Sequence, residues 1–199
     1  MRAIQHVPIN SPGYFQLFAG ALRNPVDDVG YNSPWIYYDR LTAAAGAVAG
    51  TLFFMQTGLS ATKTLTATNL EQNGQLPPPE RALVVGMRFQ MRDNMAAADI
   101  SNFGYLSVAR MYVGKSVYAE APLHAFPGGG GLAGTTTALT ANGIQDPQAV
   151  NAWGRDGGVP IGMDQSFRVE VIVPTTFTTV GAGHDVSCLW NAWRVREVS

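Results

Sequence analysis

The clearest hydrophobic pattern in the chain lies between positions 81 and 92, where apolar residues occupy every second position. The apolar side of this alternation consists of Leu83, Val85, Met87, Phe89 and Met91. Because successive side chains of a β-strand point to opposite faces, a period of two predicts a half-buried strand. We therefore expect these five side chains to face the core.

Three consecutive prolines, Pro77, Pro78 and Pro79, lead into that strand. Proline fixes φ and has no backbone N–H, so we expect an extended segment that takes no part in ladder pairing. Such a lead-in would blunt an otherwise exposed sheet edge.

Two further strands are predicted on either side of a tight turn. Residues 105–113 and residues 116–123 both read as strands, and Gly114 and Lys115 lie between them. Two turn residues between two strands indicate a β-hairpin. Earlier in the chain, residues 51–58 read as a buried strand.

The last third of the chain contains two more candidate strands. Residues 166–173 alternate between apolar and polar, and residues 186–190 do the same before the phase is lost at 191–192. We expect a bulge or tight turn to split the strand there. Trp193 and Val195 would then continue the apolar face.

Short strands, long connections and scarce helix predict an all-β fold, a sandwich or jelly roll. No repeat or change in composition divides the chain, so one domain is expected over residues 41–199. Residues 1–40 are rich in proline and aromatic residues, which predicts an extended N-terminal arm that packs on its own domain or on a neighbour. A short helical turn, capped by Asp93 or Asn94, is compatible with residues 94–99. Residues 126–165 form a long turn-rich region, typical of loops that are functional or packed on a partner.

Composition narrows the range of functions. The apolar fraction of 46% suffices for a core, whereas only 14% of the 199 residues are charged and the net charge is −1. Few charges suit a protein whose surface is largely covered by neighbours. No run of Lys or Arg is present, so sequence-independent binding of nucleic acid has no evident source.

The chain shows no signature of secretion, of a membrane span or of cysteine chemistry. The single cysteine, Cys188, excludes an intrachain disulfide and a cysteine-based zinc cluster. We expect no signal peptide, and residues 41–60 hold too few strongly apolar residues for a membrane span.

Catalytic and metal-binding motifs are missing as well. His6, His124 and His184 have no second ligand at metal-binding spacing, and the glycine run at 127–134 lacks the Lys-Ser/Thr ending of a phosphate-binding loop. No G-x-S-x-G segment supplies a nucleophile. We therefore expect no enzyme activity, no cofactor and no metal.

Two parts of the sequence resemble jelly-roll structural proteins of bacteriophages and prophages. The segment "TNLEQNGQLPPPERALVVGMRFQM" (68–91) is similar to their loop-and-strand signature, and residues 161–174 and 186–199 are similar to their closing strands. Residues 81–83 stand where an aromatic start of the strand is expected, and Asn191 stands where a turn glycine is expected.

The resemblance implies a structural virion protein that self-assembles into the icosahedral capsid of a tail-less phage. The favoured role is the major capsid protein, with a vertex or minor protein as alternatives. Its partners would be copies of itself and other minor virion proteins, and genome contact would be left to another protein or lie across an internal membrane. The protein would be made in the bacterial cytoplasm and reside in the virion. The residues expected at subunit contacts are Tyr14, Phe15, Phe18, Trp35, Tyr37, Tyr38, Pro77, Pro78 and Pro79.

A second hypothesis is a β-sandwich module of a phage tail fibre or spike that binds carbohydrate or a receptor. Trp153, Trp190 and Trp193 could form a platform on which a sugar ring stacks. Tryptophan in the closing strands of a sandwich is otherwise typical of the core or of an interface. The exposure of these side chains distinguishes the two interpretations.

Overall fold

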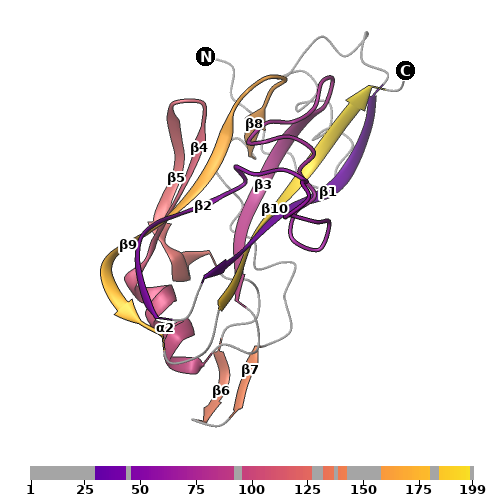
Figure 1. Cartoon of the computed structure of the whole chain (residues 1–199). Coiled ribbons are helices and arrows are strands. Elements are labelled where there is room, and N and C mark those ends of the chain that lie inside the picture. The colour runs from indigo at the N-terminus through magenta and orange to yellow at the C-terminus, as the bar shows by residue number, and fades with distance from the viewer. Residues whose placement is uncertain are drawn as a thin grey trace, which may run out of the picture.

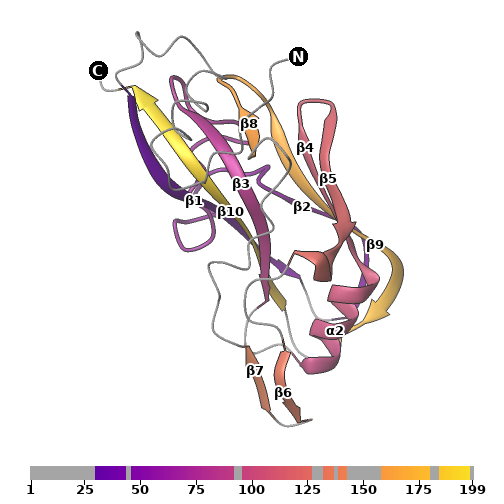
Figure 2. The same cartoon turned by 180° about the vertical axis from the view of Figure 1, so that it is seen from behind.

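The computed structural model describes residues 30–43, 46–91, 96–126, 132–136, 139–142, 158–179 and 184–197, and the statements below concern these residues. They form two four-stranded antiparallel sheets that pack face to face (Figures 1 and 2). The all-β sandwich predicted from the alternating pattern is confirmed.

Each sheet combines strands from distant parts of the chain. Sheet A contains, in spatial order, β1 (Gly30–Ala43), β10 (His184–Glu197), β3 (Arg81–Met91) and β8 (Val159–Ile161). Sheet B contains β2 (Ala47–Phe54), β9 (Phe167–Thr178), β4 (Val108–Val113) and β5 (Ser116–Pro122). Every pairing between neighbours is antiparallel.

The strands of the two sheets pair from the outside of the chain inward. The first of them, β1, pairs with the last, β10, and the second, β2, pairs with β9. In the same way β3 pairs with β8, and β4 pairs with β5. The chain thus follows the path of one long hairpin folded across both sheets.

One end of the sandwich is closed by helix. The helix α2 (Ala97–Leu106) and the short helix η1 (Leu123–Ala125) lie next to each other at the end of β9, and Phe103 of α2 meets Phe177 with 5.9 Å between ring centroids. Beyond them lies the separate hairpin of β6 (Leu132–Thr136) and β7 (Leu139–Asn142), as Figures 1 and 2 show. The helix is longer and begins later than the turn predicted at 94–99, so residues 105–106 are helical and β4 starts only at Val108.

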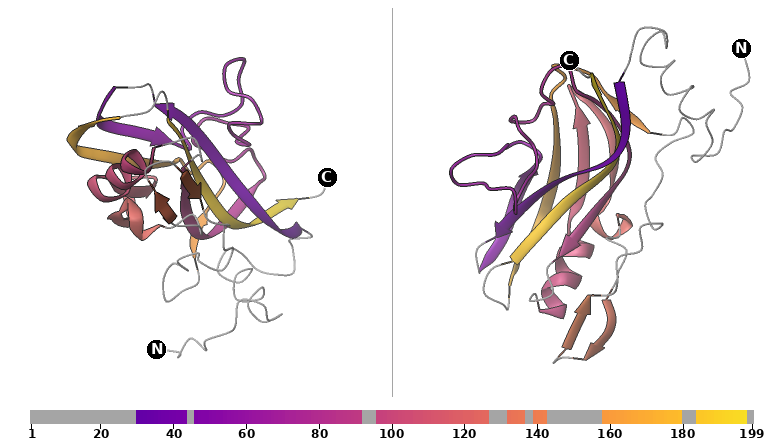
Figure 3. Two further views of the ribbon diagram at one scale, coloured as in Figure 1. Left: turned by 90° about the horizontal axis from the view of Figure 1, so that it is seen from below. Right: turned by 90° about the vertical axis from the view of Figure 1, so that its right-hand side faces the viewer.

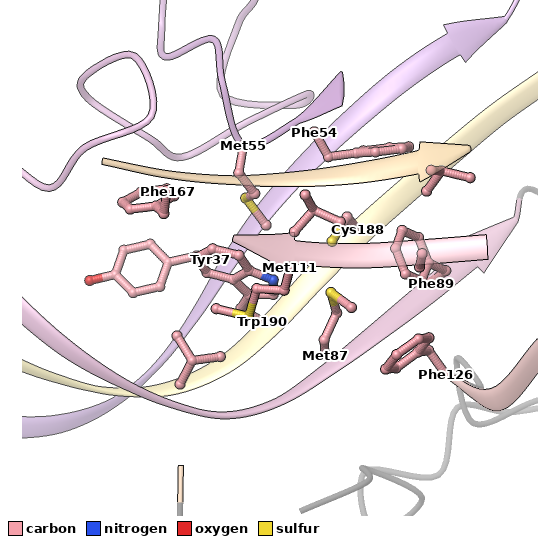
Figure 4. Packing of buried hydrophobic residues seen from close by; sticks show 14 of the residues in the cluster. Tyr37, Phe54, Met55, Met87, Phe89, Met111, Phe126, Phe167, Cys188 and Trp190 are labelled. Atoms are coloured by element: carbon pink, nitrogen blue, oxygen red, sulfur yellow. The ribbon is translucent and has the colours of Figure 1, made fainter. Parts of the chain in front are cut away.

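The hydrophobic core lies between the two sheets (Figure 4). Phe89 of sheet A meets Phe54 of sheet B with ring centroids 5.7 Å apart, and Trp190 of sheet A meets Phe167 of sheet B at 5.2 Å. Trp190 and Phe54 have no exposed surface. Because aromatic side chains bury large areas, these contacts bind the sheets into one unit.

The hairpin predicted around Gly114 is confirmed. Val113 of β4 pairs with Ser116 of β5, which leaves a two-residue turn. Gly114 has φ of +59°, a value that glycine adopts without steric cost. The turn therefore follows directly from the local sequence.

The predicted strand at 81–91 exists, but the expected core-facing set is wrong in its first half. Val84 pairs with Ala192 and Gly86 pairs with Asn191, so Val85 is an extra residue on β3. This bulge reverses the alternation. Ala82 and Val84 belong to the core cluster before the bulge, and Met87 and Phe89 belong to it after the bulge. Leu83 is buried but lies outside this cluster, and Val85 is half-buried.

An irregularity does occur at the predicted place, because the pairing of β10 with β3 shifts register between Asn191 and Ala192, but it does not split the strand. The strand β10 runs without interruption, and Val186, Cys188, Trp190 and Ala192 all belong to the core. Neither Trp193 nor Val195 continues the apolar face. The irregularity is opposite this point, on β3, because a bulge inserts its extra residue into only one of two paired strands.

The three prolines form a turn rather than an extended lead-in. The Glu80 N–H donates to the Pro77 carbonyl oxygen at 2.8 Å, and the Pro78–Pro79 peptide within this turn is cis. The strand that follows is no free edge either, because β3 pairs with β10 on one side and with β8 on the other.

The predicted end of the arm, at residue 40, falls inside the strand β1. The strand β1 begins at Gly30, and Gly30–Ala43 pair in register with β10 along their whole length. Residues 1–29, with Tyr14, Phe15 and Phe18, lie outside the described residues. What they do remains a prediction.

Candidate functional site

The described residues contain no arrangement typical of a catalytic or metal centre. In that part of the chain, no group of three or more His, Cys, Asp or Glu side chains is placed to hold a metal ion. Among the same residues, no helix is both long and apolar enough to cross a membrane. Burial raises the pKa of the Cys188 thiol well above its usual value, with a further contribution from Asp39. Cys188 is therefore a core side chain, as predicted.

The most unusual group in the interior is the carboxylate of Asp39 on β1. It has no exposed surface, Lys63 Nζ lies 2.5 Å from Oδ1, and the Met55 N–H donates to Oδ2 at 2.7 Å. Burial raises its pKa from 3.8, against the opposing effects of Lys63 and the Met55 N–H. These contacts tie β1 to the loop between β2 and β3.

That loop also covers the outer edge of β1, beside which it projects in Figure 3. The Arg40 N–H donates to the Ala67 carbonyl oxygen at 2.7 Å, and the Tyr38 N–H donates to Asn69 Oδ1 at 2.9 Å. Asn69 Nδ2 in turn donates to the Ile36 carbonyl oxygen at 2.7 Å. Since these backbone groups already have partners, this edge is closed to pairing with another strand.

A second buried acid, Glu80, lies at the end of the proline turn. The Tyr37 hydroxyl donates to Glu80 Oε1 at 2.5 Å, and only 3% of either residue is exposed. Burial first, and Glu80 second, raise the pKa of Tyr37 far above its usual range. Tyr37 was predicted at a subunit contact, but its side chain lies inside its own sandwich and is not available to a neighbour.

The other predicted contact residues that the structure describes do not form one patch. Trp35 is half-buried on the core side of β1 with the Arg194 guanidinium 3.5 Å from its ring centroid, whereas Tyr38 points away from the core and donates its hydroxyl to the Leu65 carbonyl oxygen. Pro78 is exposed, and Pro77 and Pro79 are half-buried. Their role in subunit contact stays a prediction.

The outer face of sheet B carries charges that are neutralised in pairs. Arg110 Nε lies 2.5 Å from Glu120 Oε2, and Arg168 Nε lies 2.7 Å from Glu170 Oε1. The Arg168 guanidinium also lies 4.0 Å from the ring centroid of Tyr112. Phe53 and Val117 are exposed on the same face, so ion pairs and apolar side chains share it.

The outer face of sheet A is different, and the sequence pattern did not reveal it. We use this name for the side chains of β1, β10, β3 and β8 that point away from the core. One register row across the four strands is apolar and consists of Pro34, Trp193, Leu83 and Pro160. Within this row Leu83 is buried, with 6% exposed, and Trp193 is half-buried. Ile36, two positions from Pro34 on β1, is 45% exposed. The missed signal is the presence of Pro34 and Ile36 at alternate positions on the outward side of β1.

The tryptophans do not form the platform that a sugar-binding module would need. Trp190 has no exposed surface and lies in the core, while Trp193 is in register with Leu83 on the opposite face of sheet A. Trp153 lies outside the described residues. The interpretation of Trp190 as a core residue is therefore confirmed.

A scan against protein-family models finds no match, and searches of the curated proteins and of the solved structures find no similar protein.

Proposed function

We propose that this chain is a structural virion protein with a jelly-roll fold that self-assembles into the icosahedral capsid of a tail-less phage, as its major capsid protein. The observation that carries the proposal is the pairing of strands from the ends of the chain inward. A jelly roll consists of eight antiparallel strands in two sheets, and viral capsid domains use it often. The resemblance of residues 68–91 to phage proteins agrees with this assignment.

The spatial order of the strands supports the fold in detail. Numbered along the chain without the separate β6–β7 hairpin, sheet A has the order first, eighth, third and sixth, and sheet B has second, seventh, fourth and fifth. A hairpin of four antiparallel pairs, wrapped so that alternate pairs fall in opposite sheets, produces this order. Simple meanders place consecutive strands side by side instead.

Exposed apolar side chains on the outer faces support assembly, because stable interfaces between subunits bury apolar surface. The outer face of sheet A carries Ile36, which is 45% exposed, and the outer face of sheet B carries Phe53 and Val117, which are 44% and 49% exposed, beside two ion pairs. Because scattered ion pairs suit contact with water, we infer that sheet A faces neighbouring subunits.

The carbohydrate-binding alternative has less support. Jelly rolls also occur in lectins, so the fold alone does not separate the two functions. The alternative depended on a tryptophan platform, and Trp190 is fully buried. A monomer that binds glycans would nevertheless favour it.

Size and shape in solution test the proposal. Gel filtration and electron microscopy of the purified protein should show closed shells or capsomer-sized oligomers. A stable monomer under all assembly conditions, together with binding on a glycan array, would contradict the capsid role.

A matched pair of variants tests the use of sheet A. Ile36 and Phe53 are exposed to nearly the same extent, 45% and 44%, on the outer faces of sheets A and B respectively. Ile36→Glu should prevent assembly because it places a charge in an apolar contact. Phe53→Glu should still assemble, and the reverse result would assign the contact to sheet B.

A further inference from the structure

Arg88 of β3 is a largely buried cation. Only 6% of the residue is exposed, and of its three guanidinium nitrogens Nε is buried without a hydrogen-bond partner. The ion pairs of Lys63, Arg110 and Arg168 do not involve Arg88. The desolvated part of such a charge is costly unless an anion compensates it.

The neighbours of Arg88 on the outer face of sheet A carry no negative charge. Leu189 of β10 lies directly opposite in register, and the diagonal positions on that strand are Ser187 and Asn191. On β3 itself the flanking positions on this face are Gly86 and Gln90. Burial alone lowers the pKa of Arg88, which is consistent with the lack of a nearby carboxylate.

A buried acceptor without a donor lies on the same face. Asn191 Oδ1 is buried and has no hydrogen-bond partner. Asn191 pairs with Gly86, two positions from Arg88, and diagonal neighbours of this kind lie about 7–8 Å apart, within reach of long side chains. The face therefore presents a charged donor and a neutral acceptor close together.

We propose that Arg88 and Asn191 form a binding site for a hydrogen phosphate group, either free or as a phosphate monoester. The guanidinium matches the geometry of phosphate oxygens and supplies the charge that binds them. The hydroxyl of a protonated phosphate donates to Asn191 Oδ1. A carboxylate has no such donor, and water has no charge to compensate Arg88.

Two further groups on this face suit an anion. Ser187, diagonal to Arg88, offers a hydroxyl, and Arg40 lies in register with Ser187 on β1. None of the ion pairs in the described part of the chain involves Arg40. Its charge adds to the positive potential around Arg88, whereas Asp185, on the same face of β10, lies two positions beyond Ser187 and farther from Arg88. All residues of the site belong to one chain, so the site can be tested on the unassembled subunit.

Thermal unfolding in matched salts tests the site. The melting temperature is measured in sodium phosphate and in sodium chloride at equal pH and ionic strength, for the wild type, Arg88→Met and Arg110→Met. Phosphate stabilises many proteins non-specifically, so the difference between variants is the decisive quantity. Wild type and Arg110→Met should gain about 2–4 °C more from phosphate than Arg88→Met does.

The same variants make a second prediction in chloride. Arg88→Met removes an uncompensated charge, so its melting temperature there should equal or exceed that of the wild type. If the melting temperature of the wild type gains no more from phosphate than that of Arg88→Met, the proposal is overturned.

Calorimetric titration identifies the ligand and does not depend on Arg88→Met being folded. At a pH of about 5.5, below the second pKa of a phosphate monoester, inorganic phosphate and glycerol phosphate should each bind once per chain, and acetate should not bind, because it lacks the hydroxyl for Asn191. Arg88→Lys keeps the charge but loses the planar fork, and should bind phosphate about tenfold more weakly. Equal binding of acetate, or unchanged affinity in both Arg88→Lys and Asn191→Leu, would exclude the site.

Discussion

Single residues in this sandwich hold the loop between β2 and β3 against β1. Two buried acids, Asp39 and Glu80, each receive a hydrogen bond or an ion pair from a residue far away in sequence. A buried acceptor that loses its only donor costs more than the net value of the bond, because it is not rehydrated. These contacts are therefore points at which a conservative substitution has a measurable effect.

Removal of one hydroxyl tests the contact between Tyr37 and Glu80. Tyr37→Phe should lower the free energy of unfolding by about 1–3 kcal/mol, because Glu80 stays buried without its donor. Urea unfolding followed by tryptophan fluorescence measures the change. Tyr38→Phe is the control, since Tyr38 is only half-buried and its loss should be at most about 1 kcal/mol. Equal effects of the two substitutions would show that Glu80 has another partner.

The ionisation of Asp39 gives stability a pH dependence. Burial raises the pKa of Asp39 in the folded state above 3.8, so the folded protein holds this proton over a pH range in which the unfolded chain has lost it. This contribution to stability is complete below pH 3.8 and is lost as the pH rises through the raised pKa. Asn at this position cannot ionise.

The difference in unfolding free energy between Asp39→Asn and the wild type isolates this effect. This difference should shift in favour of the variant as the pH rises from 3.8 through the raised pKa of Asp39, which already includes the opposing effect of Lys63. Urea unfolding at a series of pH values measures it. A difference that does not change with pH would mean that Asp39 has an ordinary pKa.

At the scale of the elements, turns and bulges determine which residues face the core. The two-residue turn at Gly114 could be predicted because its conformation depends only on local sterics. The bulge at Val85 could not, because an extra residue on β3 is defined only by its pairing with β10. The alternating pattern therefore predicted the strand correctly. It predicted the wrong core-facing residues for the first half of the strand.

Two glycines with positive φ should differ in their tolerance of a side chain. A Cβ on Gly114 would meet no atom within 4 Å, so Gly114→Ala should cost only about 1–2 kcal/mol of backbone strain. A Cβ on Gly158, which precedes β8, would lie 2.8 Å from the Val84 carbonyl oxygen. Gly158→Ala should therefore cost at least about 3 kcal/mol and disturb the pairing of β8 with β3.

Thermal and urea unfolding of the two glycine variants provide the comparison. Each replaces one glycine by the smallest side chain, so the difference between them reports the contact with Val84. A larger loss of unfolding free energy in Gly114→Ala than in Gly158→Ala would contradict the close approach of Gly158 to the Val84 carbonyl oxygen.

At the scale of the whole molecule, the sandwich has one hydrophobic core, which lies between the two sheets. Cys188 lies on β10, between β1 and β3, and has no exposed surface. No local opening of a loop exposes a side chain in this position. Its reactivity therefore reports on unfolding of the sandwich as a unit.

Thiol labelling measures that cooperativity. In native buffer, Cys188 should react with a thiol reagent at least about a thousandfold more slowly than in the unfolded chain, because reaction requires global opening and burial raises the pKa of the thiol. The labelling rate should rise in parallel with the unfolded fraction as urea is added. Rapid labelling in native buffer would contradict a single cooperative core.

Much of the fold was accessible from the sequence, and little of the candidate site was. The alternating segments predicted the all-β class, the hairpin at Gly114 and the interior position of Cys188 correctly. The predicted contact residues were chosen by type, and the structure places Tyr37 inside and Tyr38 outside on adjacent positions of β1. Neither Arg88 nor the apolar row through Trp193 could be selected, because both depend on the neighbours that other strands supply.

The sequence by itself determined what depends on residues close along the chain: strands by alternation, a tight turn by glycine and the near absence of helix. Only the tertiary structure decided the order of strands in each sheet, the phase of β3 and which side chains lie on the two outer faces. Pairing β1 with β10 brings together residues about 150 positions apart, such as Asp39 and Cys188. A local pattern contains no information about such partners. Neighbours that are distant in sequence bury Arg88 and bring Lys63 to Asp39, whereas nothing comparable covers the side chain of Ile36, which stays 45% exposed.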